Sequence, residues 1–170
     1  MTMTDRPIAF VLGSDSDLPV LDSAFAALQE LGLGFHVRIL SAHRTPEEAG
    51  EFARTAKANG IKVLVGVAGM AAHLAGALAA QSSLPVLGVP VDSGPLAGED
   101  ALLSTAMMPP GIPVAAMGIG KAAAKNAALM AARILALSDL QLAERLEQVR
   151  RAERDKTLAK DREVRARFSC

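Results

Sequence analysis

A histidine and an arginine stand side by side in the segment Ser-Ala-His-Arg-Thr-Pro, residues 41–46. The imidazole of His43 can give or take a proton near neutral pH. The guanidinium of Arg44 is a permanent cation whose planar fork matches a phosphate or a carboxylate. We therefore expect acid–base chemistry by His43 on an anionic substrate held by Arg44. The alternative is a surface loop whose polar residues are incidental.

A second polar segment, Gly-Ser-Asp-Ser-Asp at residues 13–17, directly follows a short apolar run. Backbone N–H groups at the start of a helix favour a phosphate, and a carboxylate suits the hydroxyls of a ribose. The alternative is plain capping of that helix by Ser16 or Asp17. Neither the G-x-x-x-x-G-K-[ST] nor the G-x-G-x-x-G pattern occurs in this segment, so it gives no support for ATP or NAD binding.

A third segment, residues 68–76, consists almost entirely of small residues around His73. Small side chains let a ligand approach the backbone closely, but they also let a helix pack tightly, and both interpretations stay open. His36, by contrast, lies among apolar residues of an expected strand, and we interpret it as a structural histidine.

The apolar pattern indicates which elements position these segments. Short continuous apolar runs, typical of buried parallel strands, alternate with stretches of helical periodicity. We expect strands at residues 8–12, 35–40, 62–67, 85–89 and 113–117. We expect helices at 18–31, from Thr45 onward, from about 73 to 82, at 99–104, at 121–137 and at 139–165. Thr45, Pro46 and Glu48 form a strong helix start, with threonine as the N-cap of a capping box.

Strand–helix alternation predicts an α/β fold, a three-layer α-β-α sandwich around a five-stranded parallel sheet. We expect the flavodoxin-like strand order 2-1-3-4-5, with an additional C-terminal helix. No linker or repeat interrupts the chain, so residues 1–170 should form one domain, with a core at about 7–138 and a charged helix at about 139–165. Ligands bind at the carboxyl ends of such strands, where the three segments should meet.

Composition narrows the class of partner. Formal net charge is +0, and 51% of residues are hydrophobic, which excludes a disordered chain. Residues 140–170 hold 9 of the 18 basic and 6 of the 18 acidic residues, and this mixture predicts a solvated helix. Trp and Tyr are absent, so few side chains can stack on bases, and we expect no nucleic-acid partner.

The termini carry no targeting pattern that we recognise. The single cysteine, Cys170, allows no intramolecular disulfide, and the first residues lack the charged-then-apolar order of a secretion signal. No apolar run approaches the roughly 20 residues of a membrane span. We expect a cytoplasmic protein without membrane contact.

Taken together, the motifs resemble the N5-carboxyaminoimidazole ribonucleotide mutase family, class I of the phosphoribosylaminoimidazole carboxylase catalytic subunits. The resemblance covers about residues 7–150. The matching motifs are Gly13-Ser-x-Ser-Asp17, Ser41-Ala-His-Arg-Thr-Pro46, Ala71-Ala-His-Leu-x-Gly76, Leu87-Gly-Val-Pro90, Met108-Pro-x-Gly-Ile-Pro113 and Gly120-Lys-x-x-x-x-Asn126.

The resemblance implies an isomerase of purine (IMP) biosynthesis. Such an enzyme moves a carboxylate from the exocyclic nitrogen of an aminoimidazole ribonucleotide to a ring carbon, through enclosed CO2 and with no metal or cofactor. The resemblance assigns proton transfer to His43. It assigns substrate binding to Ser14, Asp17, Ser41, Ala42, Arg44, Gly69, Ala71, His73 and Leu74.

The resemblance further implies a homo-octamer whose sites are completed by neighbouring subunits. His73 favours the mutase over the nearest alternative, a direct aminoimidazole ribonucleotide carboxylase, whose branch typically lacks this histidine. The more distant alternative, a flavodoxin-like nucleotide-binding module, is disfavoured by the absence of Trp and Tyr. Two positions depart from the family pattern: Ala75 replaces a proline, and Pro110 stands where the mutase branch often has arginine.

Overall fold

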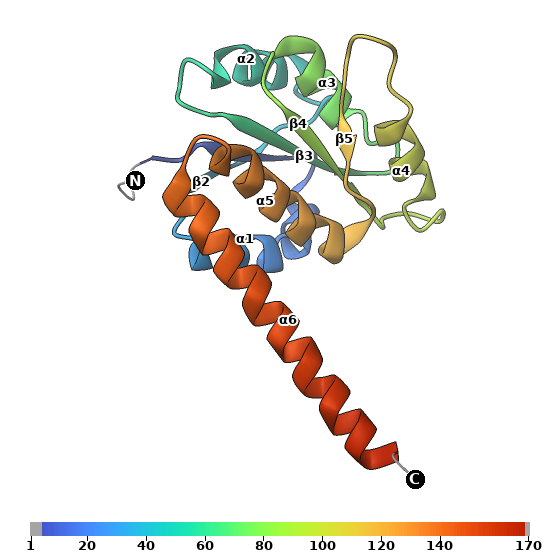
Figure 1. Cartoon of the computed structure of the whole chain (residues 1–170). Helices are drawn as coiled ribbons and strands as arrows, with labels where there is room; N and C mark the ends of the chain where they lie inside the picture. Colours follow the sequence, from blue (N-terminus) through green and yellow to red (C-terminus); the bar gives the residue numbers. More distant parts are fainter. Residues whose placement is uncertain (1–4, 169–170) are drawn as a thin grey trace.

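A computed structural model describes residues 5–168, and its centre is a sheet of five parallel strands. Figure 1 shows this sheet between layers of helices. The strands are β1 (Ile8–Leu12), β2 (Phe35–Ile39), β3 (Val63–Gly69), β4 (Val86–Val91) and β5 (Ala115–Ala116). Their order in the sheet is β2-β1-β3-β4-β5, and every neighbouring pair is parallel. The predicted fold class and strand order are confirmed. Cys170 and the first four residues lie outside the described part of the chain.

Helices cover both faces of the sheet. They are η1, a 3-10 helix (Asp15–Val20), α1 (Asp22–Glu30), α2 (Pro46–Ala56), α3 (Leu74–Gln81), α4 (Glu99–Ala106), α5 (Gly120–Ala136) and α6 (Leu140–Phe168). Helices α1 and α5 pack together on one face, and α2 and α3 on the other (Figure 1). None of the helices between residues 5 and 168 combines the length and apolarity that a membrane span requires.

Alternation along β1 divides the core into two layers. Phe10 and its same-face neighbours in β1 are buried with α1 and α5, whereas Ala9 and Val11 are buried with α2 and α3. On the first face, α5 presents a stripe of fully buried alanines, so its backbone can lie close to the sheet. Helices therefore shield both faces of the central strands from solvent, which explains the continuous apolar sequences of these strands.

The predicted helix at 18–31 is wrong in its first part, because the chain forms η1 and then α1, with Leu21 between them. Pro19 lies inside η1 and has no N–H to donate, so it cannot make one of the backbone hydrogen bonds that a continuous helix from η1 through α1 requires. The predicted strand at 113–117 shrinks to two exposed residues at the sheet edge, just after Pro113. Strands β3 and β4 each run two residues further than predicted, and the added residues of β3, Ala68 and Gly69, line the site described below.

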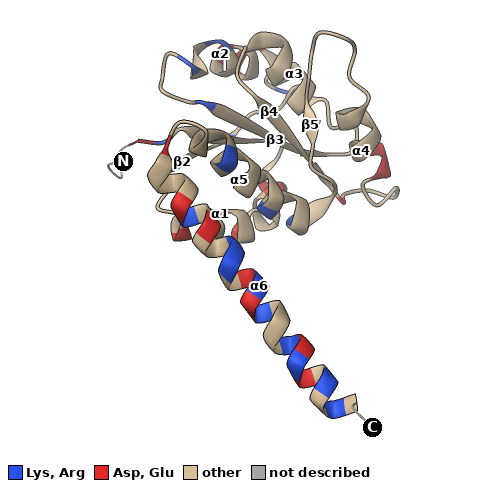
Figure 2. Cartoon of the chain, viewed as in Figure 1, with Lys and Arg blue, Asp and Glu red and all other residues tan. Residues whose placement is uncertain are grey.

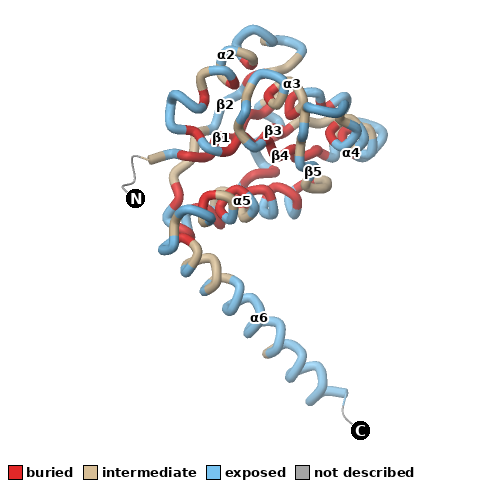
Figure 3. The backbone as a smooth tube through the Cα atoms, turned by 45° about the horizontal axis from the view of Figure 1, so that its top comes forward, coloured by how far each residue is buried: buried red, intermediate tan, exposed pale blue. Residues whose placement is uncertain are grey.

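Helix α6 begins on the body and then leaves it (Figure 3). Leu142 is fully buried, Leu146 and Val149 pack against the same core, and Arg145 Nε donates to the Leu31 carbonyl at 3.0 Å. Beyond residue 150 every described residue is exposed except the half-buried Ala159. The helix continues to Phe168, three residues past the predicted end, and its charges alternate in sign along the exposed part (Figure 2).

Candidate active site

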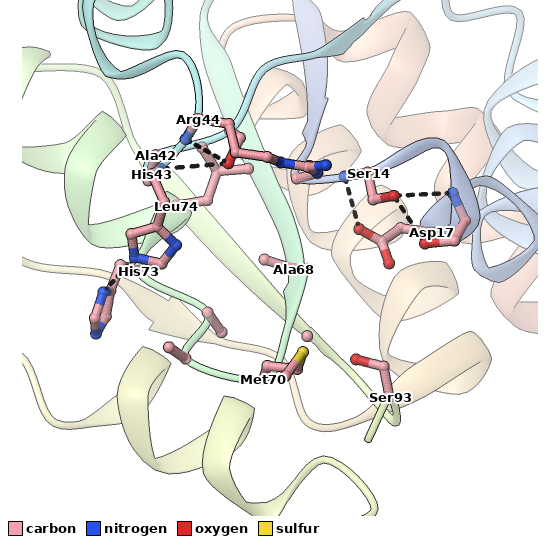
Figure 4. Close-up of a pocket in the computed structure, with 16 residues that line it drawn as sticks. Ser14, Asp17, Ala42, His43, Arg44, Ala68, Met70, His73, Leu74 and Ser93 are labelled. Carbon is pink, nitrogen blue, oxygen red and sulfur yellow. Dashed lines mark hydrogen bonds between the residues drawn. The ribbon is translucent and has the colours of Figure 1, made fainter.

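The three polar segments meet at the carboxyl edge of the sheet, around a pocket of about 520 Å³ (Figure 4). The loops after β1, β2 and β3 supply most of its wall, and the loop after β4 adds Ser93. All ten residues named from the sequence line this pocket. They are Ser14, Asp17, Ser41, Ala42, His43, Arg44, Gly69, Ala71, His73 and Leu74.

The loop after β1 is fixed by a capping box. The Ser14 side chain accepts from Ser16 N at 3.3 Å, and Asp17 Oδ2 accepts from Ser14 N at 3.1 Å. The N-cap is therefore Ser14 rather than Ser16 or Asp17. Asp17 is only 6% exposed, and this burial raises the pKa of its carboxyl, although the Ser14 hydrogen bond and the nearby charge of Arg44 act in the opposite direction.

The loop after β2 is held by its own side chains. Thr45 Oγ1 accepts from Ser41 N at 2.8 Å and donates to the Ser41 carbonyl at 3.2 Å. Thr45 does occupy the N-cap position of α2, but the predicted capping box is wrong, because its hydroxyl is used within the loop. Ser41 Oγ in turn accepts from the backbone N–H groups of His43 and Arg44.

Two side chains of this loop reach to its neighbours on either side. Arg44 Nη2 donates to the Gly13 carbonyl at 2.6 Å, so its cation is held at the loop after β1. His43 Nε2 lies 2.8 Å from His73 Nδ1, and the two rings meet edge to face with centroids 4.9 Å apart. One nitrogen of this pair must donate while the other accepts, so the rings share a single proton.

The loop after β3 has an unusual backbone. Met70 and Ala72 have φ values of 56° and 30°, in the left-handed region that L residues rarely adopt. Ala72 N donates to the Gly69 carbonyl at 3.1 Å, which closes a tight turn just before His73. Strained backbone of this kind concentrates at ligand sites.

Ser93 lines the pocket but was missed from the sequence. Ser93 lies in the long connection after β4, where no motif marks it. The rule that placed the first three loops at the carboxyl ends of strands also applies to this fourth loop, and it could have found the serine.

His36 lies outside this pocket, in a second hollow between edge strand β2 and α2. It is half-buried, and its pKa is lowered by burial and by the charges of Arg6 and Arg38. Its ring makes no hydrogen bond to other residues in the described part of the chain. Among residues 5–168, no three His, Cys, Asp or Glu side chains group as metal ligands.

Comparison with known proteins adds to this geometry. Residues 7–156 match the sequence profile of the family described as AIR carboxylase. The chain belongs to the AIR carboxylase family. Curated relatives named N5-carboxyaminoimidazole ribonucleotide mutase include one from Brucella melitensis, 51% identical over 86% of this chain and 90% of its own. Another, from Escherichia coli K12, is 48% identical over 89% of both chains.

The AIR carboxylase fold is also shared with a solved structure. The crystal structure of Treponema denticola PurE has a TM-score of 0.82 and 27% identity, covering 96% of this chain and 98% of that one. The family match ends at residue 156, whereas α6 continues for about three more turns to Phe168. The end of α6 thus lies beyond the part that defines the AIR carboxylase family.

Proposed function

We propose that this member of the AIR carboxylase family is an N5-carboxyaminoimidazole ribonucleotide mutase. It converts N5-carboxyaminoimidazole ribonucleotide to 4-carboxy-5-aminoimidazole ribonucleotide in purine (IMP) biosynthesis. The observation that carries the proposal is a pocket in which the His43–His73 pair and the Arg44 cation converge, in a chain whose relatives bear this name.

The nucleotide part of the substrate binds at the loops after β1 and β2. Arg44 and the Ser14 hydroxyl, whose proton turns from the exposed Asp15 carboxylate to the ligand, hold the phosphate through charge-assisted hydrogen bonds. Asp17 accepts from a ribose hydroxyl, which replaces some of the hydration that its carboxylate loses on burial. Ser41, Ala42 and Leu74 shape the wall. The tether from Arg44 to Gly13 supports this assignment, because it holds the cation beside Ser14.

His43 moves the proton in both half-reactions. In the first, the carbamate C–N bond breaks, CO2 departs, and His43 delivers a proton to the exocyclic nitrogen. In the second, the ring carbon forms a C–C bond to the same CO2. That carbon then carries both a proton and a carboxylate, and His43 removes the proton. The proton shared with His73 supports this role, because the pair can supply a proton and accept it back.

The loop after β3 holds CO2 between the two steps. Backbone N–H groups of residues 69–72 can face a carboxylate, because Gly69 and Ala71 leave the backbone uncovered. Water must be excluded during this interval, since free CO2 would otherwise escape.

We further propose that the enzyme is a cytoplasmic homo-oligomer, by family resemblance an octamer. A neighbouring subunit would wall off the pocket, which is open in the single chain at the exposed Met70. Exposed apolar side chains on and next to α4, notably Leu103 and Met107, give such a neighbour a surface to cover. A phosphorylated substrate, which does not cross membranes freely, supports the cytoplasmic location.

An assay with two substrates tests the function. The purified protein is given the labelled carbamate, or aminoimidazole ribonucleotide with bicarbonate, both without ATP. We expect turnover of the carbamate, with most carboxylate label retained in the product at limiting bicarbonate. Complete exchange with dissolved bicarbonate on each turnover would instead indicate the direct carboxylase. Absence of both reactions would contradict the proposal.

A further inference from the structure

Ser93 reaches the pocket from the loop that follows β4. In the β3–β4 pairing, Gly69 is the register partner of Val91, so Ser93 stands only two residues beyond the end of β4. A Cβ at Gly69 would overlap Ser93 Oγ and would come within 3.0 Å of Ser93 Cβ. Glycine at position 69 is therefore what leaves room for the serine side chain at this wall.

The loop carrying Ser93 is built to hold a fixed position. Gly94, Ala97 and Gly98 have φ values of 80°, 50° and 86°, which make the chain turn sharply after β4. A Cβ placed on Gly94 would contact Met70 Cγ at 3.7 Å, so the loops after β3 and β4 pack together. The serine is thus presented by two interlocked loops.

The Ser93 hydroxyl has no hydrogen-bond partner among residues 5–168, although the side chain is half-buried. In the ligand-free protein the other two serines named for this site already have partners in their own loops: Ser14 Oγ donates to Asp15 Oδ1, and Ser41 Oγ accepts from two backbone N–H groups. A polar group left unpaired in a pocket wall is suited to a ligand.

The position of Ser93 within the pocket indicates which part of a ligand its hydroxyl contacts. Figure 4 shows Ser93 at the end of the pocket away from His43 and His73, on the side where Asp17 lies. A group bound between the Asp17 carboxylate and Ser93 should offer O–H donors rather than a second negative charge. The vicinal hydroxyls of a ribose offer two such donors, and a serine hydroxyl can both accept from and donate to one of them.

We propose that Ser93 binds one hydroxyl of the substrate ribose while Asp17 binds the other, so that Ser93 selects for substrates that carry the hydroxyl it binds. The inference rests on the proposed function for the identity of the nucleotide. It adds Ser93, from a fourth loop, as a specificity residue. The Ser93 hydroxyl reaches the sugar because position 69 is glycine.

The test combines a change in the protein with a change in the ligand and compares their effects on KM. Wild type, Ser93→Ala and a control, Ser104→Ala, are assayed with the ribonucleotide carbamate and with its 2′-deoxy and 3′-deoxy analogues. The Ser104 hydroxyl donates to the Asp100 carbonyl within α4, away from the pocket, so this control should match wild type. Circular dichroism and thermal melting first establish that each variant folds as wild type does.

A neutral hydrogen bond predicts that Ser93→Ala raises the KM for the ribonucleotide roughly two- to tenfold, with kcat within about twofold of wild type. For the analogue that lacks the bonded hydroxyl, wild type and Ser93→Ala should have the same KM. An unchanged KM for the ribonucleotide, or an equal increase for all three substrates, overturns the inference. Lack of wild-type turnover on the ribonucleotide would instead refute the proposed function.

Discussion

In the proposed mechanism, His43 is the residue that transfers the proton. In His43→Asn we expect kcat to fall by about 10²-fold or more, because general acid–base catalysis is typically worth that much. Binding of aminoimidazole ribonucleotide should persist, since Arg44, Ser14 and Asp17 remain. Steady-state kinetics and calorimetry separate the two effects. His36→Asn is the matched control, because His36 lies outside the pocket and should keep full turnover.

If His43→Asn retained near-wild-type turnover, the proton would have to pass elsewhere, and His73 would be the nearest group to examine. His73 lines the pocket, and its Nδ1 also lies 2.8 Å from His43 Nε2, within reach of a shared proton. The sequence resemblance placed both histidines in one site, but only the structure shows that their nitrogens are within hydrogen-bonding distance.

Asp17 should destabilise the ligand-free protein at neutral pH. Burial raises the pKa of its carboxyl above the ordinary value of 3.8, so ionisation costs more in the folded than in the unfolded chain. Its contribution to stability is therefore most favourable below pH 3.8 and is lost as the pH rises through the folded-state pKa. A carboxylate that is buried although it lowers the stability of the fold is consistent with a role in ligand binding.

Asp17→Asn should thus raise the Tm of the ligand-free protein at pH 7 and weaken substrate binding. The gain in Tm should shrink as the pH is lowered toward 3.8, where the wild-type carboxyl becomes neutral too. Thermal melting across pH measures both trends, with Asp161→Asn on the exposed part of α6 as a control. A Tm at pH 7 equal to or below that of wild type would refute the burial argument.

At the scale of elements, glycines decide how closely helices approach the sheet. An added Cβ at Gly66 in β3 would lie 2.8 Å from Ala75 Cα in α3, where backbone would have to move. At Gly50 in α2 the nearest atoms belong only to the far end of the exposed Arg54 side chain. The same substitution should therefore act in opposite directions at the two positions.

We expect Gly66→Ala to lower the free energy of unfolding by about 1–3 kcal/mol through overpacking. Turnover should fall as well, because α3 begins directly after His73. Gly50→Ala should raise the free energy of unfolding by about 0.5–1 kcal/mol, since alanine favours the interior of a helix. Denaturant unfolding measures both. Stabilisation by Gly66→Ala would show that α3 can move away without penalty.

The elements also show what could be predicted from the sequence. Apolar runs located four strands within about two residues at each end, because buried parallel strands need continuous hydrophobic side chains. The rule for carboxyl ends predicted that three loops meet, and the family resemblance named ten residues that line the pocket between them. Local sequence could not reveal that the Thr45 hydroxyl bonds to Ser41 instead of capping α2, since both partners were equally near. The rule for carboxyl ends could have pointed to the loop that carries Ser93, but the approach of Ser93 to Gly69 depends on the β3–β4 register, which is a long-range contact.

At the scale of the whole molecule, α6 is the element whose C-terminal part extends from the body and is exposed. Residues 150–168 carry eight basic and four acidic side chains, for a net charge of +4, while residues 1–149 carry −4. The stripe of Leu142, Leu146 and Val149 that packs on the body continues into charged residues, which is why the helix leaves the core. Its ion pairs, such as Lys156–Glu153, lie within the helix and are exposed, so they stabilise it little.

In proteins most helix stability comes from packing of one face, so the exposed part of α6 should gain stability from the oppositely charged body, residues 1–149, of a neighbouring subunit. We predict that deleting residues 151–170 leaves the body folded, because Leu142, Leu146 and Val149 are retained. Light scattering should give a wild-type mass several times 17.6 kDa and a smaller assembly for the truncated chain. Higher salt should have a similar effect if charge contributes. An unchanged assembly after truncation would mean that the subunit contacts lie elsewhere, and the exposed side chains at α4 would then be the surface to substitute.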